Sequence, residues 1–125
     1  MSNPNLASAT ATIFGVTATL TPGTTAATVL LSNAASSSTV MRVNQIVAAN
    51  VNGTSAVDVT VTINSAAAGG GTAFPIASTI SVPPDASLIV VDKTTGLYLM
   101  EDKSIVVTSG TSSGITYSIS YELIA

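Results

Sequence analysis

ITYSISYEL, at residues 115–123, decides the fold class, because its large apolar residues occupy every second position. Mostly Thr and Ser alternate with them. Side chains of an extended strand point alternately to its two faces, so this pattern gathers the large side chains on one face. The stretch therefore predicts a half-buried strand of an antiparallel sheet that covers an apolar core.

Similar patterns recur along the rest of the chain. VDVTVTI at residues 57–63 alternates in the same way, and other runs are rich in β-branched residues. With the opening stretch, the predicted strands cover residues 9–20, 25–32, 39–50, 57–63, 72–82, 86–92, 97–100, 104–109 and 115–123. These runs, of which 97–100 is only four residues long, indicate about eight short strands and predict an all-β fold, an antiparallel β-sandwich or jelly roll.

Turn-forming residues separate these runs. Asn52-Gly53 predicts a tight hairpin turn, and Asn52 with Thr54 also matches a glycosylation acceptor, which would require secretion. Pro75 is expected at a sheet edge or a bulge. The run SAAAGGGTA at residues 65–73 is expected to be flexible, either a surface loop or an arm that orders on contact.

The length of 125 residues corresponds to one domain. Residues 1–9 carry little apolar weight and almost no charge, so we expect a flexible N-terminal arm that a partner orders. The sandwich domain is expected to span residues 10–125. The first residues show no signal-peptide pattern, and no apolar run reaches the length of a membrane span.

The chain contains neither Cys nor His, and these absences exclude most catalytic chemistry. Without Cys there are no disulfides, thiolate metal ligands or thiol nucleophiles. Without His the chain lacks the usual general base near neutral pH and the commonest ligand of transition metals. We therefore expect no enzyme, no catalytic residues, no metal site and no cofactor.

Charged residues make up 7% of the chain, and its net charge is −3. A patch of Lys and Arg for phosphate groups is missing, so we expect neither nucleic acid nor a membrane surface as a partner. Hydroxyl groups of Ser and Thr fill most polar positions, and removing water from a hydroxyl costs less free energy than removing it from an ion. The composition favours a subunit of a protein assembly.

Five of the nine charged residues lie close together, namely Asp92, Lys93, Glu101, Asp102 and Lys103. Glu101 and Asp102 are adjacent, so in a strand they would point to opposite faces, which suits no acid–base pair. We interpret the cluster as a solvated hairpin at which Asp102 or Ser104 bonds local backbone groups. The alternative is a Ca²⁺ ion held by Asp85, Asp92 or Asp102.

Several segments follow one another in a specific order: MSNPN at the start, VNQIVAANVNGTSAVDVTVTI at residues 43–63, ASTISVPPDASLIVVDK at 77–93, LYLMEDKSIVVTS at 97–109 and SYELIA at 120–125. This order resembles a group of small virion structural proteins of tailed bacteriophages, notably cyanophages. In that group YLEEGDSL forms the corner and the chain ends in SYEE. Here Lys103 replaces an acidic residue of the corner, and a Lys among carboxylates would repel a cation.

The resemblance implies a particle component, and the small size suggests a capsid decoration (cement) protein on the capsid surface of the virion, made in the cytoplasm of the bacterial host. Its partners would be the major capsid protein or other virion proteins, and a homo-oligomer, with a trimer favoured. Decoration would add interface area across capsomer seams, at about 1,600 Å² per contact. One alternative is a tail, neck or fibre component. Another is a carbohydrate- or host-surface-binding module, for which a chain without Trp is poorly equipped.

We expect three parts of the chain to contact neighbours in such an assembly: the N-terminal segment of residues 1–9, the loop of residues 66–73 and the exposed strand faces, with the charged corner at the rim of the interface. The candidate interface residues are Asn3, Pro4, Asn5, Leu6, Gly69, Gly70, Gly71, Phe74, Tyr98, Met100 and Glu101.

Overall fold

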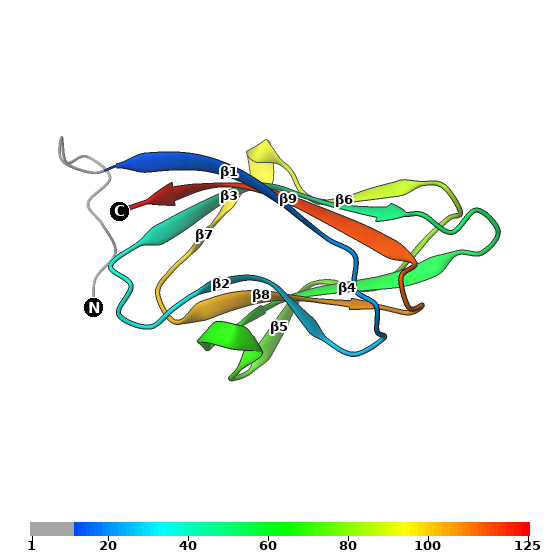
Figure 1. Cartoon of the computed structure of the whole chain (residues 1–125), viewed down its shortest axis with the longest axis horizontal. Coiled ribbons are helices and arrows are strands. Elements are labelled where there is room, and N and C mark those ends of the chain that lie inside the picture. The colour runs from blue at the N-terminus through cyan, green and yellow to red at the C-terminus, as the bar shows by residue number, and fades with distance from the viewer. Residues whose placement is uncertain (1–11) are drawn as a thin grey trace.

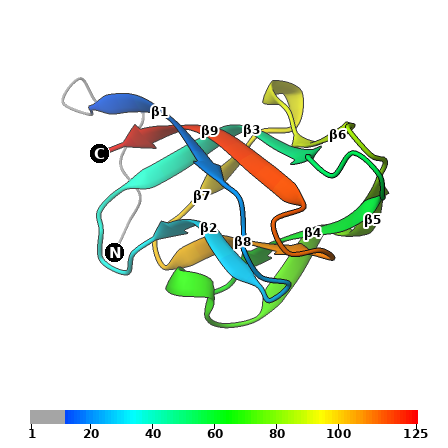
Figure 2. The same ribbon diagram turned by 45° about the vertical axis from the view of Figure 1, so that its right-hand side comes forward.

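The computed structural model describes residues 12–125, and nine strands in this range form two antiparallel sheets that pack face to face (Figure 1). The all-β sandwich predicted from the sequence is therefore confirmed, with nine strands where about eight were expected. The arm predicted at residues 1–9 lies outside the described residues. Figure 2 shows the two layers from a second direction.

The first sheet has the order β1-β9-β3-β6, and β7 also pairs with β3. Its strands are β1 (Ile13–Leu20), β9 (Ile115–Ile124), β3 (Val40–Asn50), β6 (Ser87–Val91) and β7 (Leu97–Leu99). β7 pairs with the beginning of β3 and β6 with its end, so these two short strands share one edge of the sheet. β1 forms the opposite edge.

The second sheet has the order β2-β8-β4-β5. Its strands are β2 (Thr28–Asn33), β8 (Lys103–Ser109), β4 (Val57–Asn64) and β5 (Ala73–Val82). Two short 3₁₀ helices, η1 (Ala67–Gly69) and η2 (Lys93–Thr95), were not expected from the sequence. None of the helices in the described part of the chain has the length and apolar character to cross a membrane.

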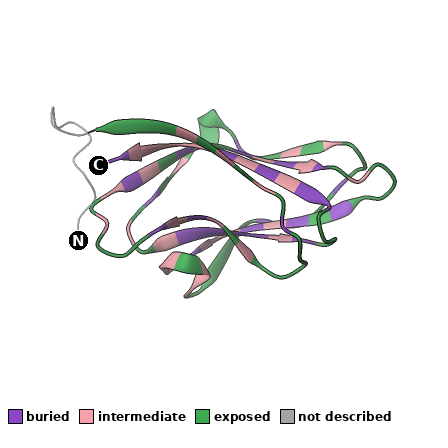
Figure 3. Cartoon of the chain, viewed as in Figure 1, coloured by how far each residue is buried: buried purple, intermediate pink, exposed green. Residues whose placement is uncertain are grey.

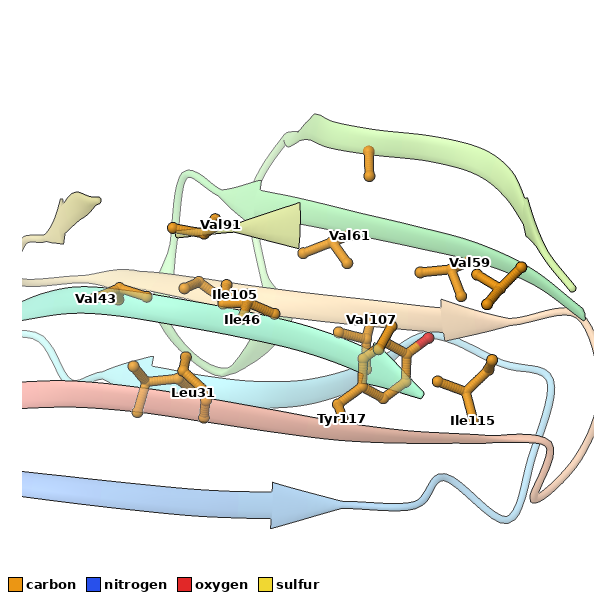
Figure 4. Close-up of a cluster of buried hydrophobic side chains, with 14 of the residues drawn as sticks. Leu31, Val43, Ile46, Val59, Val61, Val91, Ile105, Val107, Ile115 and Tyr117 are labelled. Atoms are coloured by element: carbon orange, nitrogen blue, oxygen red, sulfur yellow. The ribbon is translucent and has the colours of Figure 1, made fainter. Parts of the chain in front are cut away.

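The core lies between the two sheets, and the alternation seen in the sequence fills it. Ile115, Tyr117 and Ile119 of β9 are fully buried, and Figure 3 shows buried residues alternating with less buried ones along this strand. They meet β3 and β8 residues such as Ile46 and Val107 (Figure 4). One inward face per strand therefore supplies the apolar burial that stabilises the fold.

Tyr117 is the largest fully buried side chain of the described residues. Its hydroxyl lies 2.9 Å from the Ser109 hydroxyl and donates to the Thr108 carbonyl at 3.3 Å. Burial raises the pKa of the Tyr117 phenol above its ordinary value of 10.0, because the phenolate would lose hydration in the core. The predicted packing role of this tyrosine is thus confirmed, and its polar end is satisfied.

Most connections pass from one sheet to the other. β3 and β4 lie in different sheets, so the predicted hairpin at Asn52-Gly53 is wrong. Asn52 instead stabilises an irregular crossover, since its side-chain oxygen accepts the backbone N–H groups of Thr54 at 2.9 Å and Ser55 at 3.2 Å. Such Asx turns satisfy the local backbone without any strand pairing.

The four sheet edges differ in regularity. β5 forms one edge of its sheet and carries Pro75 where its register with β4 shifts, which confirms the expectation for this proline. Register shifts also interrupt the pairing of β2 with β8 and of β6 with β3. β1 pairs with β9 over its whole length without a shift.

Candidate assembly surface

The charged corner around Glu101, Asp102 and Lys103 joins β7 to β8, which belong to different sheets. It is therefore a crossover between the layers, and the hairpin interpretation is wrong. Asp102, at a φ of 56°, accepts the backbone N–H of Ala67 at 3.1 Å through its carboxylate. The Lys103 ammonium donates to the Ser65 carbonyl at 3.2 Å. The two charges bind a loop that lies about 35 residues away in the sequence.

The loop of residues 65–72 contains the three consecutive glycines and is held against the second sheet. The buried Ser104 hydroxyl donates to the Ala66 carbonyl at 2.8 Å and accepts the Gly69 N–H at 2.9 Å. Ser32 accepts the Ala68 N–H at 2.9 Å. Of the two alternatives predicted for this segment, the structure shows the surface loop, and strand side chains satisfy its backbone groups. The loop covers the outward face of β2 and β8 near their Ser residues.

Replacing Ser104 with Ala should therefore loosen this loop and destabilise the fold by about 1–3 kcal/mol, since a partly buried carbonyl and a partly buried N–H lose their partner. Hydrogen exchange should rise at Gly69, and the free energy of unfolding should fall in a denaturant titration. Ser81→Ala removes a hydroxyl from an exposed position of β5 and is the matched control. Unchanged exchange at Gly69 in the Ser104 variant would contradict the anchoring role.

Asp92 is the first residue of the charged cluster along the chain, and it caps the 3₁₀ helix η2. Its carboxylate accepts the backbone N–H groups of Thr94 and Thr95, both at 3.0 Å. Hydrogen bonds from the hydroxyls of Thr94 and Thr95 lower the pKa of the Asp92 carboxyl below its ordinary value. The Thr95 hydroxyl accepts the Asp92 N–H in return, which completes a capping box. This carboxylate serves the local backbone.

A calcium site at the corner finds no support in the geometry. In residues 12–125, Asp85, Asp92 and Asp102 do not gather with other acidic groups into a set of three that could hold an ion. Glu101 is half-buried, and both of its carboxylate oxygens are shielded from solvent without a hydrogen-bond partner among the described residues. The side chains of Asp102 and Lys103 form hydrogen bonds with backbone groups, so their role at the corner is structural.

The candidate interface residues fall into separate places. Asn3, Pro4, Asn5 and Leu6 lie outside the described residues. Gly69, Gly70 and Gly71 belong to the bound loop, and Asp102 brings this loop to the corner that contains Met100 and Glu101. Phe74 on β5, Tyr98 on β7 and Met100 are exposed. Their role in contacts stays a prediction.

Other exposed apolar residues were not singled out from the sequence. Ile13 and Phe14 begin the edge strand β1, and Ile89 lies on the edge strand β6. In the sequence these residues look like any strand residue, because their exposure depends on which strands lie at an edge. The alternation in the sequence of β1 predicts a strand, but only the order of the strands in the sheet shows that β1 lies at an edge.

No protein-family model matches the sequence, and a search of curated proteins finds no match. A chain from the solved structure of Bacillus endospore appendages, described as disulfide-linked pili, is similar in structure. The TM-score is 0.53 at 15% sequence identity, and the match covers 99% of this chain and 95% of that one. At this identity the likeness shows a shared fold, a β-sandwich that a protein of pili also adopts.

Proposed function

We propose that this chain is a structural subunit that associates with copies of itself in a larger protein assembly. The observation that carries the proposal is the exposure of large apolar side chains: Phe14 and Phe74 are each 58% exposed, and Ile89 is 60% exposed. Water around such groups is released when a protein surface covers them, which favours association.

The sparse charge supports the same proposal. With 7% charged residues, neighbouring copies meet little electrostatic repulsion, and few ions must lose their hydration in a contact. The shared fold with a chain of Bacillus pili adds support, because the sandwich is compatible with a polymer of subunits. This chain contains no Cys, so its copies are not joined by disulfide bonds.

In its finer form, the proposal is a virion structural protein, a capsid decoration protein of a tailed bacteriophage. The order of segments that resembles small virion proteins supports it. The partners would then be the major capsid protein and further copies of this chain, and the added interface area would strengthen the capsid seams. A subunit of a pilus-like polymer is the second candidate, and the solved Bacillus structure favours it.

Two measurements test the proposal. Sedimentation of the purified chain should show a concentration-dependent oligomer, and mass spectrometry should detect the chain in virions or filaments purified from its source. A Phe74→Ser variant should weaken the oligomer or the particle binding, because it removes an exposed apolar group. Thr94→Ser, on exposed η2, is the control that keeps the apolar surface. A strict monomer that is absent from both kinds of particle would refute the proposal.

A further inference from the structure

Among the described strands, the outer edge of β1 presents a row of backbone groups that pair with no other strand. Thr12 and Ala125 exchange two backbone hydrogen bonds, each 2.9 Å long, and the register continues unbroken into β1 and β9. In an antiparallel pair such bonded residues alternate with residues whose backbone groups point away. Ile13, Gly15, Thr17 and Thr19 therefore direct their N–H and C=O groups away from β9. Within residues 12–125, β1 pairs with β9 alone.

β1 lacks the devices that protect the other edges. β5 carries Pro75 and two register shifts, and one shift interrupts the pairing of β2 and of β6 with their neighbours. β7 has three residues. β1 has eight residues in continuous register, with neither a charged residue nor a proline. A long, regular and uncharged edge is a template for the addition of another strand.

We infer that β1 pairs antiparallel with β1 of a second copy of this chain, about a twofold axis at Val16, so that the two five-stranded sheets become continuous. The inference rests on the proposed function and names the contact. Two identical edges are self-complementary in this arrangement, since each donor of one copy meets an acceptor of the other.

The hydrogen-bonding pattern selects the register. The apolar faces of the two sheets stay on one side only if even-numbered residues oppose even-numbered ones. With Val16 opposite Val16, Ile13 opposes Thr19 and Gly15 opposes Thr17. All four outward N–H groups of each copy then find a carbonyl, which gives eight hydrogen bonds across the contact. Centring the pairing on Thr17 would leave Ile13 without a partner inside β1.

The side chains agree with this register. On the core-facing side, the exposed Phe14 opposes the small Ala18 of the second copy, and this pairing covers an aromatic ring that water now surrounds. On the other side, a Cβ built on Gly15 would meet no atom within 4 Å, so the approach of Thr17 from the second copy is unobstructed. No charge in β1 opposes the contact.

The Thr17→Pro variant tests the pairing directly. Proline removes the outward N–H of Thr17, which has no partner among residues 12–125, so β1 should remain on β9. Analytical ultracentrifugation of the wild type should show a dimer, and the variant should raise the dimer Kd by about tenfold or more. Its thermal unfolding should stay close to that of the wild type. The matched control is Ser87→Pro on β6, the other edge of the same sheet, which should leave the dimer intact.

A cross-link tests the register without depending on the proline. The chain has no Cys, so a Val16→Cys variant carries one thiol per copy. Opposite residues at a twofold axis lie within disulfide distance, so oxidation should yield a covalent dimer on a non-reducing gel. Ile89→Cys, exposed on β6, should give far less.

An unchanged dimer in the Thr17→Pro variant, or a Val16→Cys variant that does not cross-link, overturns the inference. In either case a wild-type oligomer would still support the proposed function, because another surface would then make the contact. A wild-type monomer found in purified virions or filaments also overturns the β1 pairing and leaves the structural role in place.

Discussion

Replacing Ile119 with Ala is expected to lower the free energy of unfolding by about 3–4 kcal/mol, because the side chain is fully buried between the sheets. Ile119 lies opposite Ile46 across the pairing of β9 with β3. Removing three methyl or methylene groups there loses their transfer free energy and leaves a cavity that the rigid strands cannot fill by collapse. Since small domains are stable by about 5–15 kcal/mol, this loss is a large fraction of the total.

The matched control is Ile13→Ala, the same chemical change at a residue that is 59% exposed. Its effect should stay below about 1 kcal/mol, since little apolar area returns to water. Urea titrations followed by far-UV circular dichroism would give both values, with unchanged m-values as a check that the comparison is valid. Equal losses for the two variants would contradict the placement of the core.

Replacing Asn33 with Ala is expected to destabilise the chain by about 3 kcal/mol, because a fully buried amide joins three parts of the fold. Its Nδ2 donates to the carbonyls of Thr39 at 3.0 Å and Leu99 at 3.1 Å. Its Oδ1 accepts the hydroxyls of Ser37 at 2.6 Å and Thr39 at 3.1 Å. Alanine would leave both carbonyls and both hydroxyls without this partner at the junction of the two sheets.

Asn44→Ala is the control for this prediction. The Asn44 amide makes one side-chain bond, to the Glu122 carboxylate at 3.1 Å, and it is not fully buried. A loss of less than about 1 kcal/mol is expected there. Thermal unfolding of both variants separates the two cases, and hydrogen exchange at Thr39 and Leu99 locates the change. A loss at Asn33 no larger than that at Asn44 would show that the network is dispensable.

The positions of the strands could be predicted from the sequence, because they depend on local alternation. Ile115, Tyr117 and Ile119 recur with a period of two, and these three residues line the core. Pro75 was placed at an edge or bulge because proline donates no hydrogen bond to a sheet, and β5 has both features there. Both features depend on the residues of one strand, so the sequence of that strand is enough to predict them.

The order of the strands and the contacts of the loops could not be predicted in the same way. Asn52-Gly53 has the residues of a hairpin turn, but β3 and β4 enter different sheets, and no local pattern distinguishes a hairpin from a crossover. The glycines at 69–71 left open a surface loop or an arm that orders on contact. Ser104 and Asp102, far along the chain, accept N–H groups of this segment and hold it as a surface loop.

The charged corner shows the same difference between local and distant information. Its predicted role as a polar turn was right in kind, since Asp92 and Asp102 bond backbone groups. Asp102 or Ser104 was predicted to bond local backbone groups, but both side chains bond the distant loop of residues 65–72. The candidate interface depends still more on strand order, and it could not be read from local pattern.

The irregular registers of β2, β5 and β6 reduce the number of sheet edges to which a strand of another molecule could add. A subunit with two open edges could extend its sheets without end, as in a cross-β fibre. Within residues 12–125, proline and register shifts interrupt three edges, and β1 is the edge that stays regular. A twofold contact at that edge uses it up, and sheet extension stops at a pair. Any larger architecture must therefore come from side-chain contacts, whose geometry can be curved or closed independently of the sheets.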